Sequence, residues 1–349
     1  MLSSAPGNTQ SERQAFYARI GASHLTPLWE VLHSLVPQSP RSPCATVGWH
    51  YDEVRPYLME AGRLIGAKEA ERRVLIFENP ALRGHSCLTQ TLYAGLQLLL
   101  PGEVAPSHRH TQSALRLVLE GEGAYTAVDG ERTVMRPGDF IITPSMTWHD
   151  HGNPGDQPVV WLDGLDIPLL RFLDAGFAEK YPDDTHPVTR PEGDANARFG
   201  GNLAPMDYTP PRVGASPIFN YPYAQTRETL TKVSRGASVD PHHGHGLRFL
   251  NPTTGAAPIP TIGACVQLLP PGFKGRPYRA TDSRIFCCLE GEGRIDTDDW
   301  SFEFAARDVF TVPSWIAHRL SSPSEAVVFS FSERPVQQAL GLWREERIA

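Results

Sequence analysis

The sequence predicts a mainly β protein built from two tandem barrels, and three observations support this prediction. The chain has 349 residues, which is enough for about two domains. Its 32 Pro and 30 Gly favour many short strands joined by tight turns. The segment Gln97–Gly123 returns as Gln267–Gly293, with 13 of 27 positions identical. Self-similarity at a fixed offset indicates a duplicated structural unit.

The duplication extends beyond these two segments. Asp139–Pro144 (DFIITP) corresponds to Asp308–Pro313 (DVFTVP), and Phe77–Pro80 (FENP) corresponds to Phe249–Pro252 (FLNP). Each copy therefore covers at least about 70 residues. Within a copy, short apolar runs are bounded by Gly, Pro and Asp, which is typical of strands and turns.

Segments with helical character lie outside the two copies. We expect a helical N-terminal arm over 1–69, a first β unit over 70–166, a helix and a Pro/Gly-rich connection over 167–224, a second β unit over 225–335 and a helical tail over 336–349. The helices themselves are expected over Ser11–Ile20, Leu25–Leu35, Tyr51–Gly62, Ile167–Glu179 and Val336–Arg347.

Charge and composition disfavour several classes of protein. The net charge is −7 without a block of Lys or Arg, so a nucleic-acid partner is not expected. No apolar run reaches the roughly 20 residues that cross a bilayer, so a membrane partner is not expected either. The 5 cysteines lack CxxC spacing, which favours a reducing, cytoplasmic location over a disulfide framework.

Three histidines of the first β unit have the pattern of a metal site. His108 and His110 stand two residues apart after a Pro-Gly turn, so on a strand both imidazoles project from one face. His149 follows a second turn and would complete a three-histidine site. A lone histidine is more often a satisfied core or surface residue, but the surrounding spacing favours ligands here.

The second copy lacks this pattern. Tyr278 and Ala280 stand at the positions of His108 and His110, and only His318 remains, at the position of His149. We therefore expect one metal per chain.

Two further features accompany the histidine pattern. Phe286 replaces Arg116 in the second copy, so a cation disappears together with the ligands, and Arg116 is a candidate pocket residue. A rival cluster, His242, His243 and His245, lies in a Gly-rich turn and could hold an adventitious metal. Its role stays open.

The spacing around the three histidines resembles the two motifs of the cupin superfamily. The first reads Gly102-x5-His108-x-His110, and the second reads Gly138-x5-Pro144-x4-His149. The glutamate that cupins carry after the second histidine is missing, because those positions are Ala114 and Leu115. Three neutral ligands leave about three positions open on an octahedral ion, which suits an anionic chelating substrate and O2.

Together with the strings LVLEGEG, WLDGLDIP and LNPTTG, this arrangement is similar to the gentisate 1,2-dioxygenase family of bicupins. The resemblance implies one Fe(II) per chain, conversion of gentisate and O2 to maleylpyruvate, and a homotetramer. Salicylate and 1-hydroxy-2-naphthoate 1,2-dioxygenases share the architecture and stay as alternatives. Tyr93 differs from the Trp of the salicylate enzyme, which favours gentisate.

The resemblance also implies roles for individual residues. His108, His110 and His149 would bind iron, Arg116 would bind the substrate carboxylate, and Arg72, Tyr93 and Gln97 would line the pocket, with His151 as acid/base and Asp163 as its orienting partner.

Two other functions remain as alternatives. A manganese bicupin similar to oxalate decarboxylase would need the missing glutamate and usually a second competent site. A non-catalytic ligand-binding bicupin would be expected to lose the histidines in both copies, whereas the first copy is intact.

Overall fold

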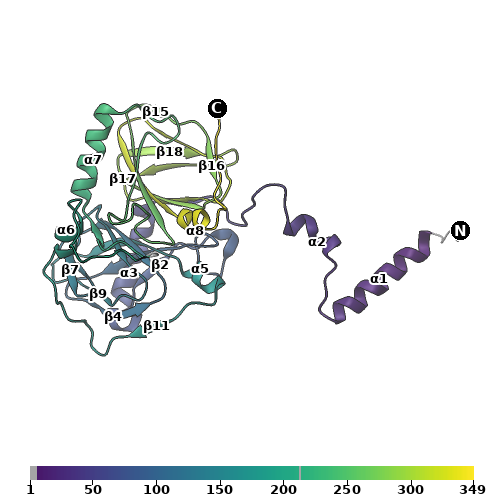
Figure 1. Ribbon diagram of the computed structural model, residues 1–349, viewed down its shortest axis with the longest axis horizontal. Helices are drawn as coiled ribbons and strands as arrows, with labels where there is room; N and C mark the ends of the chain where they lie inside the picture. Colours follow the sequence, from purple (N-terminus) through teal and green to yellow (C-terminus); the bar gives the residue numbers. More distant parts are fainter. Residues whose placement is uncertain (1–5, 212–213) are drawn as a thin grey trace. The chain divides into compact units, whose positions relative to one another are not determined.

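The structure is a computed structural model that describes residues 6–211 and 214–349 (Figure 1). It divides into a unit that ends at Arg41 and a unit from Ser42 to Ala349. The first unit contains α1 (Pro6–Ala22) and α2 (Leu28–Leu35), so the two helices expected there are confirmed. The two helices contact each other through Trp29 of α2, whose indole N–H donates to the hydroxyl of Tyr17 on α1 at 2.8 Å. No residue of α2 is buried within the chain.

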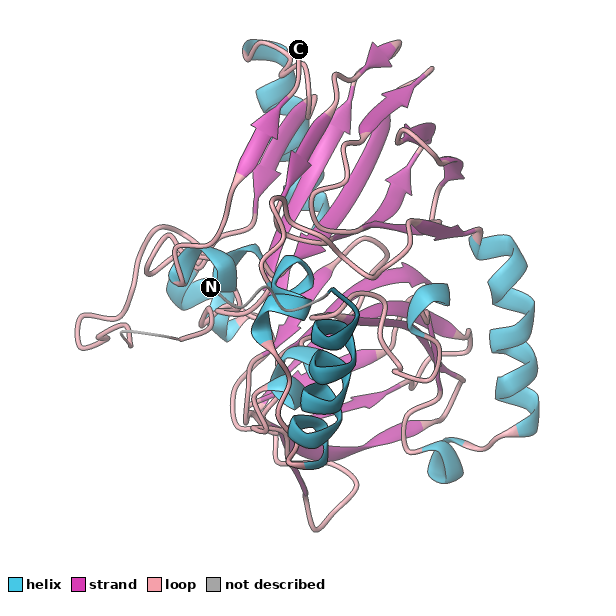
Figure 2. Cartoon of the chain, turned by 90° about the vertical axis from the view of Figure 1, so that its right-hand side faces the viewer, coloured by secondary structure: helices cyan, strands magenta, loops and turns pink. Residues whose placement is uncertain are grey.

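The second unit contains two β units, each built from two facing sheets (Figure 2). The larger sheet of the first β unit has the order β12 (Asn220–Tyr221), β8 (Phe140–Thr143), β5 (Ala114–Glu120), β10 (Val159–Leu165), β3 (Tyr93–Leu99) and β2 (Val74–Ile76). The smaller sheet has the order β11 (Ala178–Lys180), β4 (Val104–His110), β9 (His149–Gly152), β6 (Tyr125–Val128) and β7 (Glu131–Val134).

The second β unit repeats this plan. Its larger sheet has the order β1 (Val47–Trp49), β20 (Val309–Val312), β17 (Arg284–Glu290), β22 (Ala326–Ser332), β14 (Gly263–Leu269) and β13 (His245–Arg248). Its smaller sheet has the order β15 (Phe273–Lys274), β21 (Arg319–Ser322), β18 (Glu292–Asp296) and β19 (Ser301–Ala305), and β16 (Tyr278–Ala280) pairs separately with β23 (Glu345–Arg347). The prediction of a mainly β, duplicated fold is confirmed.

The two β units exchange their first strands. β1 precedes the first β unit in sequence but pairs with β20 of the second, with Gly48 opposite Phe310. β12 precedes the second β unit but pairs with β8 of the first, with Asn220 opposite Ile141. Each larger sheet is therefore completed by a strand from the other copy.

The helices that follow these strands are also duplicated. α3 (Tyr51–Leu64) and α7 (Tyr223–Gly236) start at equivalent positions, and Figure 1 shows α7 beside the β units. The Tyr51 amide donates to Asp308 and the Tyr223 amide donates to Asp139, at 2.8 and 2.9 Å. The duplication thus begins near residue 47, earlier than the sequence motifs indicate, and α7 is a helix that the sequence analysis does not predict.

Matching ion pairs hold these two helices to the ends of equivalent strands. The Arg55 guanidinium and the Tyr51 hydroxyl donate to Glu120, and Arg227 and Tyr223 donate in the same way to Glu290. The repeated LEGEG string therefore has a structural role, because its first glutamate anchors the helix of its own copy.

The ends of the two copies correspond as well. α5 (Ile167–Phe172) is followed by β11, which pairs with β4, and α8 (Arg334–Ala339) is followed by β23, which pairs with β16. The helix predicted over Ile167–Glu179 ends at Phe172 and the helix predicted over Val336–Arg347 ends at Ala339, so both predictions are wrong beyond these residues. Backbone pairing with the edge of β4 or β16 stabilises an extended segment there, which local helical propensity does not show.

Short elements complete the chain. Tyr51–Gly62 lies within α3, so that predicted helix is confirmed. The remaining helices are α4 (Ala67–Ala70), a 3₁₀ turn at Pro80–Leu82 and α6 (Asp194–Phe199) within the connection. In the described part of the chain, none of the helices combines the length and the apolar character that a transmembrane helix requires.

A buried carboxylate occupies the same position in each copy. Asp166 accepts from the Ser113 amide at 2.9 Å, and Glu333 accepts from the Ser283 amide at 3.1 Å. Burial and the neighbouring charge of Asp282 raise the pKa of Glu333 to about 7. Glu333 therefore binds a proton in the folded state over a pH range in which an unfolded glutamate has lost it.

We expect Glu333→Gln to remove a pH dependence of stability. The folded-state pKa lies above the unfolded value, so the contribution of Glu333 is present below pH 4.5 and is lost as the pH rises toward 7. The substitution should raise the free energy of unfolding by about 2 kcal/mol at pH 8 and change it little at pH 5. Urea unfolding at both pH values measures this, and an equal effect at both would contradict it.

Candidate active site

The three histidines of the metal motif converge on one point. His108 and His110 project from the same face of β4, and His149 on β9 lies directly opposite His108 in the antiparallel register. The ring centroids of His108 and His149 are 4.3 Å apart, and those of His110 and His149 are 4.9 Å apart. Their candidate ligand atoms all lie within 4.8 Å of one another, and this is the one such group found among residues 6–211 and 214–349.

The orientation of each imidazole is fixed through its Nδ1 atom. In all three rings Nδ1 contacts a backbone carbonyl oxygen two residues away, which orients the ring and leaves Nε2 as the candidate metal ligand. Nε2 of His149 is buried and has no hydrogen-bond partner, so it is available as a metal ligand. The three contacts are His108 to Pro106 at 3.2 Å, His110 to Gln112 at 2.7 Å and His149 to Thr147 at 2.9 Å.

The surroundings keep these imidazoles neutral. Burial, with the positive charge of Arg72, lowers the pKa of His108 to about 3. Burial lowers the pKa of His110 to about 4 and that of His149 well below its usual value. Since only neutral imidazole binds a metal, the group is ready to coordinate without losing protons at neutral pH.

The larger sheet places the predicted pocket residues on one face. Asp163 on β10 lies opposite Arg116 on β5, and residues directly opposite in an antiparallel pair share a face. On β3, Tyr93 and Gln97 share the face of Gly95, which lies opposite Asp163. All four predicted residues of this sheet are thus brought together, and the buried side-chain amide nitrogen of Gln97 has no partner.

Arg116 is buried, and its positive charge is only partly balanced by neighbouring groups. Its Nε atom lies 3.6 Å from Asp163 and has no hydrogen-bond partner, while another guanidinium nitrogen donates to Thr143. Asp163 also accepts from the indole N–H of Trp161 at 3.0 Å. Burial raises the pKa of Asp163 to about 6, although Arg116 acts in the opposite direction. Such a cation can accept an anionic ligand with little reorganisation.

Arg72 adds a second cation next to the histidines. Its guanidinium donates to the Pro106 carbonyl at 2.6 Å and contacts Nδ1 of His108. Burial, with the like charge of Arg116, lowers the pKa of Arg72 to about 10. The two arginines are therefore close enough to repel each other, and an anion between them would relieve that repulsion.

The adjacent Arg73 has a different role. It points to the other side of the chain and makes two hydrogen bonds to Glu103, at 2.8 and 2.6 Å, and one to the Ile65 carbonyl at 2.9 Å. Only 6% of its surface is exposed. Arg73 therefore stabilises the fold.

We expect neighbouring substitutions at these two arginines to separate activity from stability. Arg73→Gln should lower the free energy of unfolding by about 3 kcal/mol, since a buried ion pair is broken, with a normal KM in the folded fraction. Arg72→Gln should change stability by less than about 1 kcal/mol and reduce kcat/KM at least about tenfold. Urea unfolding and steady-state kinetics on both variants measure this, and equal losses of activity would contradict it.

His151 has one free nitrogen. Its Nδ1 contacts the Thr126 hydroxyl oxygen at 2.5 Å, and its Nε2 is buried without a partner. The ring lies 5.8 Å from that of His149 and 5.5 Å from that of Trp161, centroid to centroid. Burial, with the charges of Arg116 and Arg72, lowers its pKa well below the usual value. The described partners of Asp163 do not include His151, so the structure does not join the two residues directly.

The sequence analysis missed a buried pair behind the metal-binding strand. Asp150 points away from His149 and His151 and accepts from Nδ1 of His186 at 2.6 Å and from its amide at 3.0 Å. His186 belongs to the connection after the first β unit, and its Nε2 accepts from the Gly130 amide at 3.2 Å. The alternation of side chains along β9 could have predicted that Asp150 lies on the outer face. Its partner His186 could not be predicted, because it lies 36 residues away and belongs to no motif.

In the second β unit, other side chains fill the region that is equivalent to the three-histidine group. Tyr278 donates to Glu345 on β23 at 2.9 Å, and His318 packs against the rings of Tyr278 and Phe286. The Arg284 guanidinium, from the position of Ala114, lies 5.8 Å from the Tyr278 ring. The remaining cavity of about 10 Å³ is the size of a single water molecule.

The rival histidine cluster does not form a metal site in the described residues. Nδ1 of His242 contacts the carbonyls of Arg276 and Pro277, and the ring of His243 packs on Tyr278 at 4.5 Å. These residues, with His245, do not belong to the group of possible ligands found in residues 6–211 and 214–349.

A duplicated β fold with three convergent histidines in one copy defines a bicupin with a candidate metal site, and residues 95–165 match the family model described as Cupin domain. The chain is 51% identical to gentisate 1,2-dioxygenase 1 of Aquipseudomonas alcaligenes over 336 residues, covering 96% of each. It is 38% identical to 1-hydroxy-2-naphthoate 1,2-dioxygenase of Nocardioides sp., covering 95% of this chain and 87% of the relative. The structure of salicylate 1,2-dioxygenase from Pseudoaminobacter salicylatoxidans with gentisate matches with a TM-score of 0.91 and 32% identity, covering 99% of this chain and 95% of that one.

The chain therefore belongs to the family of ring-cleaving bicupin dioxygenases that contains the gentisate, salicylate and 1-hydroxy-2-naphthoate 1,2-dioxygenases.

Proposed function

We propose that this protein is an Fe(II)-dependent gentisate 1,2-dioxygenase, which converts gentisate and O2 to maleylpyruvate. The observation that carries this proposal is a three-histidine group, with a buried, partnerless Nε2 on His149, beside the two incompletely paired cations Arg72 and Arg116. Family membership and the 51% identity to a gentisate 1,2-dioxygenase support the same substrate.

The histidines His108, His110 and His149 would hold the iron through Nε2. A bound Fe(II) would supply adjacent coordination positions for substrate and O2 and a path for electrons between them. All other contributions come from the protein. The carbonyl contacts at Nδ1 fix the three rings before any metal binds, so little side-chain entropy is lost on coordination.

Arg116 and Arg72 would neutralise and orient the carboxylate of the aromatic acid. Nε of Arg116 has no partner of its own, so a bond to the substrate satisfies a buried donor. Tyr93 and Gln97 lie on the same face and would contact the ring and its hydroxyl groups.

His151 is the candidate base for the 5-hydroxyl of gentisate. Its Nδ1 contacts the Thr126 hydroxyl, and the tautomer that donates to Thr126 would present a lone pair on Nε2, while the lowered pKa of the ring disfavours a second proton. Asp163 would act by holding Arg116. Removal of the hydroxyl proton increases the electron density of the ring and favours attack by oxygen, and the bond between C1 and C2 then breaks with both oxygen atoms retained.

We also propose a cytoplasmic homotetramer. All 5 cysteines are free, as expected in a reducing compartment. Leu28, Trp29, Leu32 and Leu35 of α2 are exposed on the chain, and exposed apolar residues in one helix are typical of a subunit contact. Light scattering of the full chain and of a form without residues 1–41 would test the assembly.

The function is tested by loading the purified protein anaerobically with Fe(II) and measuring O2 uptake with gentisate, salicylate and 1-hydroxy-2-naphthoate. Gentisate should give the highest kcat/KM and a product with the absorbance of maleylpyruvate. A higher kcat/KM for either of the other acids would assign that substrate instead. Binding of iron without O2 uptake on any of the three would favour a non-catalytic bicupin.

A further inference from the structure

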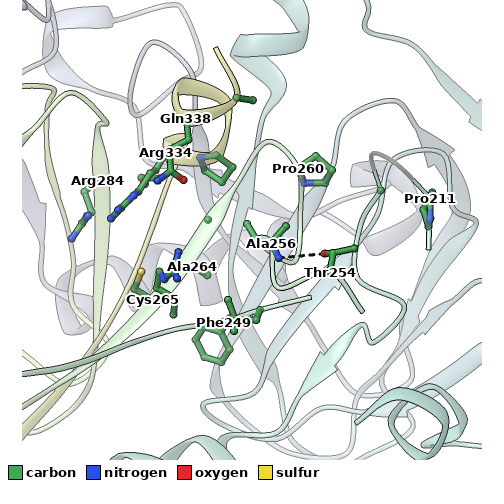
Figure 3. A pocket seen from close by; sticks show the side chains of 18 residues that line it. Pro211, Phe249, Thr254, Ala256, Pro260, Ala264, Cys265, Arg284, Arg334 and Gln338 are labelled. Carbon is green, nitrogen blue, oxygen red and sulfur yellow. Dashed lines mark hydrogen bonds between the residues drawn. The ribbon is translucent and has the colours of Figure 1, made fainter. Parts of the chain in front are cut away.

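The second β unit has a cavity that is not part of the candidate active site. It has a volume of about 310 Å³ and lies between the end of β13, the start of β14, β17 and α8 (Figure 3). This volume is at the lower end of the range of about 300–1,000 Å³ that is typical of small-molecule sites. None of the residues proposed above for metal or substrate binding lines it.

Three arginines line this cavity, namely Arg248, Arg284 and Arg334. Figure 3 shows the guanidinium groups of Arg284 and Arg334 on the side of the cavity where the Cys265 sulfur lies. All three positive charges act on the Cys265 thiol and oppose the rise in its pKa that burial causes. The arginines therefore converge on one region.

Arg334 is incompletely paired, whereas Arg284 has one ion pair and Arg248 is exposed. The nearest carboxylate to Arg284 is Asp282 at 3.6 Å, beyond a normal hydrogen bond, although Arg284 is only 8% exposed. Arg334 stacks on Trp343 at 3.8 Å, and its buried Nε has no partner. By contrast, Arg73 makes two short bonds to Glu103.

The candidate active site offers a partial parallel. Arg116, like Arg334, has a buried Nε without a partner. In both places a buried guanidinium nitrogen is left without an acceptor. Buried donors of this kind are costly unless a ligand satisfies them.

Most of the other lining residues are apolar, among them Phe249, Ala256, Pro260, Ala264 and Pro335, and Thr254, Ser332 and Gln338 add polar groups. A fully hydrated anion such as phosphate would leave these surfaces unused, whereas an organic acid with an apolar body would cover them while its carboxylate met the arginines.

We propose that this cavity binds a small organic carboxylate with an apolar body, such as a benzoate, at a second site in each chain. This inference does not depend on the proposed function, because none of the candidate active-site residues takes part. The carboxylate would contact Arg284 and Arg334, and the exposed Arg248, which also lines the cavity, would attract it.

The experiment uses the full-length, iron-loaded protein, with benzoate and inorganic phosphate as probes. The rate at which N-ethylmaleimide labels Cys265 is measured by mass spectrometry of the labelled peptide, with Cys44 as the internal reference. Benzoate should slow the labelling of Cys265 at least about fivefold, and this effect should saturate as the benzoate concentration rises. The labelling rate of Cys44 should not change. No change at Cys265, or equal protection by phosphate, would overturn the proposal.

Two variants and a control make the test specific. Arg334→Gln should raise the benzoate concentration for half-protection at least about tenfold. The control Arg235→Gln removes an exposed arginine of α7 and should leave it unchanged. Ala339 is an exposed residue that lines the cavity, and the larger side chain of Ala339→Leu should occupy the cavity and abolish protection by benzoate. This variant replaces Arg334→Gln in the test if Arg334→Gln does not fold. Unchanged half-protection in the folded variants would contradict the site.

An equilibrium measurement does not depend on the reactivity of the thiol. In fluorine NMR titrations with 4-fluorobenzoate, the unsubstituted protein should show one more site per chain than Arg334→Gln. An equal number of sites in the two proteins would overturn the proposal. Failure of catalysis with every aromatic acid would bear on the proposed function alone and would leave these results intact.

Discussion

His149→Ala is expected to abolish iron binding, while the equivalent substitution His318→Ala leaves it unchanged. The two residues hold the same position in the two copies and both are at least nine-tenths buried, so the cavities that the substitutions create should cost similar stability. His149 alone stands beside two further imidazoles. Iron content should fall from one per chain to almost none in His149→Ala, with a loss of activity well beyond about 100-fold.

Metal analysis and O2 uptake on both variants measure this, and thermal unfolding monitors the fold. Normal iron content in His149→Ala would refute the ligand set. Loss of half of the iron in His318→Ala would show that the second copy also binds metal, contrary to one iron per chain.

Arg116→Gln is expected to retain iron and to lose most of its affinity for the aromatic acid. Truncation of one partner of a buried, charged hydrogen bond costs about 2–5 kcal/mol, so kcat/KM should fall at least about 30-fold. The loss should lie mainly in KM if the carboxylate contact is made equally in the ground and transition states. Asp163 would lose its buried counter-charge, and its pKa should rise further.

The control for Arg116→Gln is Arg132→Gln, because Arg132 is an exposed arginine of β7 that stacks on Tyr125 at 3.8 Å. Its kinetics should match those of the unsubstituted protein. Unchanged kinetics in Arg116→Gln, measured by O2 uptake over a range of gentisate concentrations, would mean that the carboxylate is held elsewhere.

Much of the fold and the metal group could be predicted from the sequence because both follow from local patterns. The duplication appears as repeated strings, and residues two apart on a strand share a face, which places His108 beside His110. The distinct roles of Arg72 and Arg73 were not predicted, because the two residues precede β2 (Val74–Ile76) and no strand alternation applies to them.

The features that the sequence analysis missed depend on contacts between distant segments. β1, β12, β11 and β23 are two to three residues long, and such short strands exist only because a longer strand offers its edge. The partner of Asp150 is set by where the connection folds back, and no spacing rule predicts it. Asp163 and His151 were expected to touch, but the register of β10 directs Asp163 toward Arg116.

The exchange of β1 and β12 bears on how this chain arose. A polypeptide with only one copy would lack the strand that completes its larger sheet, and a second identical polypeptide could donate it, as in domain-swapped dimers. Two such molecules would form a twofold homodimer with a metal in each half. Joining the two genes end to end would preserve every donated contact and free one half to lose its ligands, which accounts for a protein with two similar halves and one set of histidines.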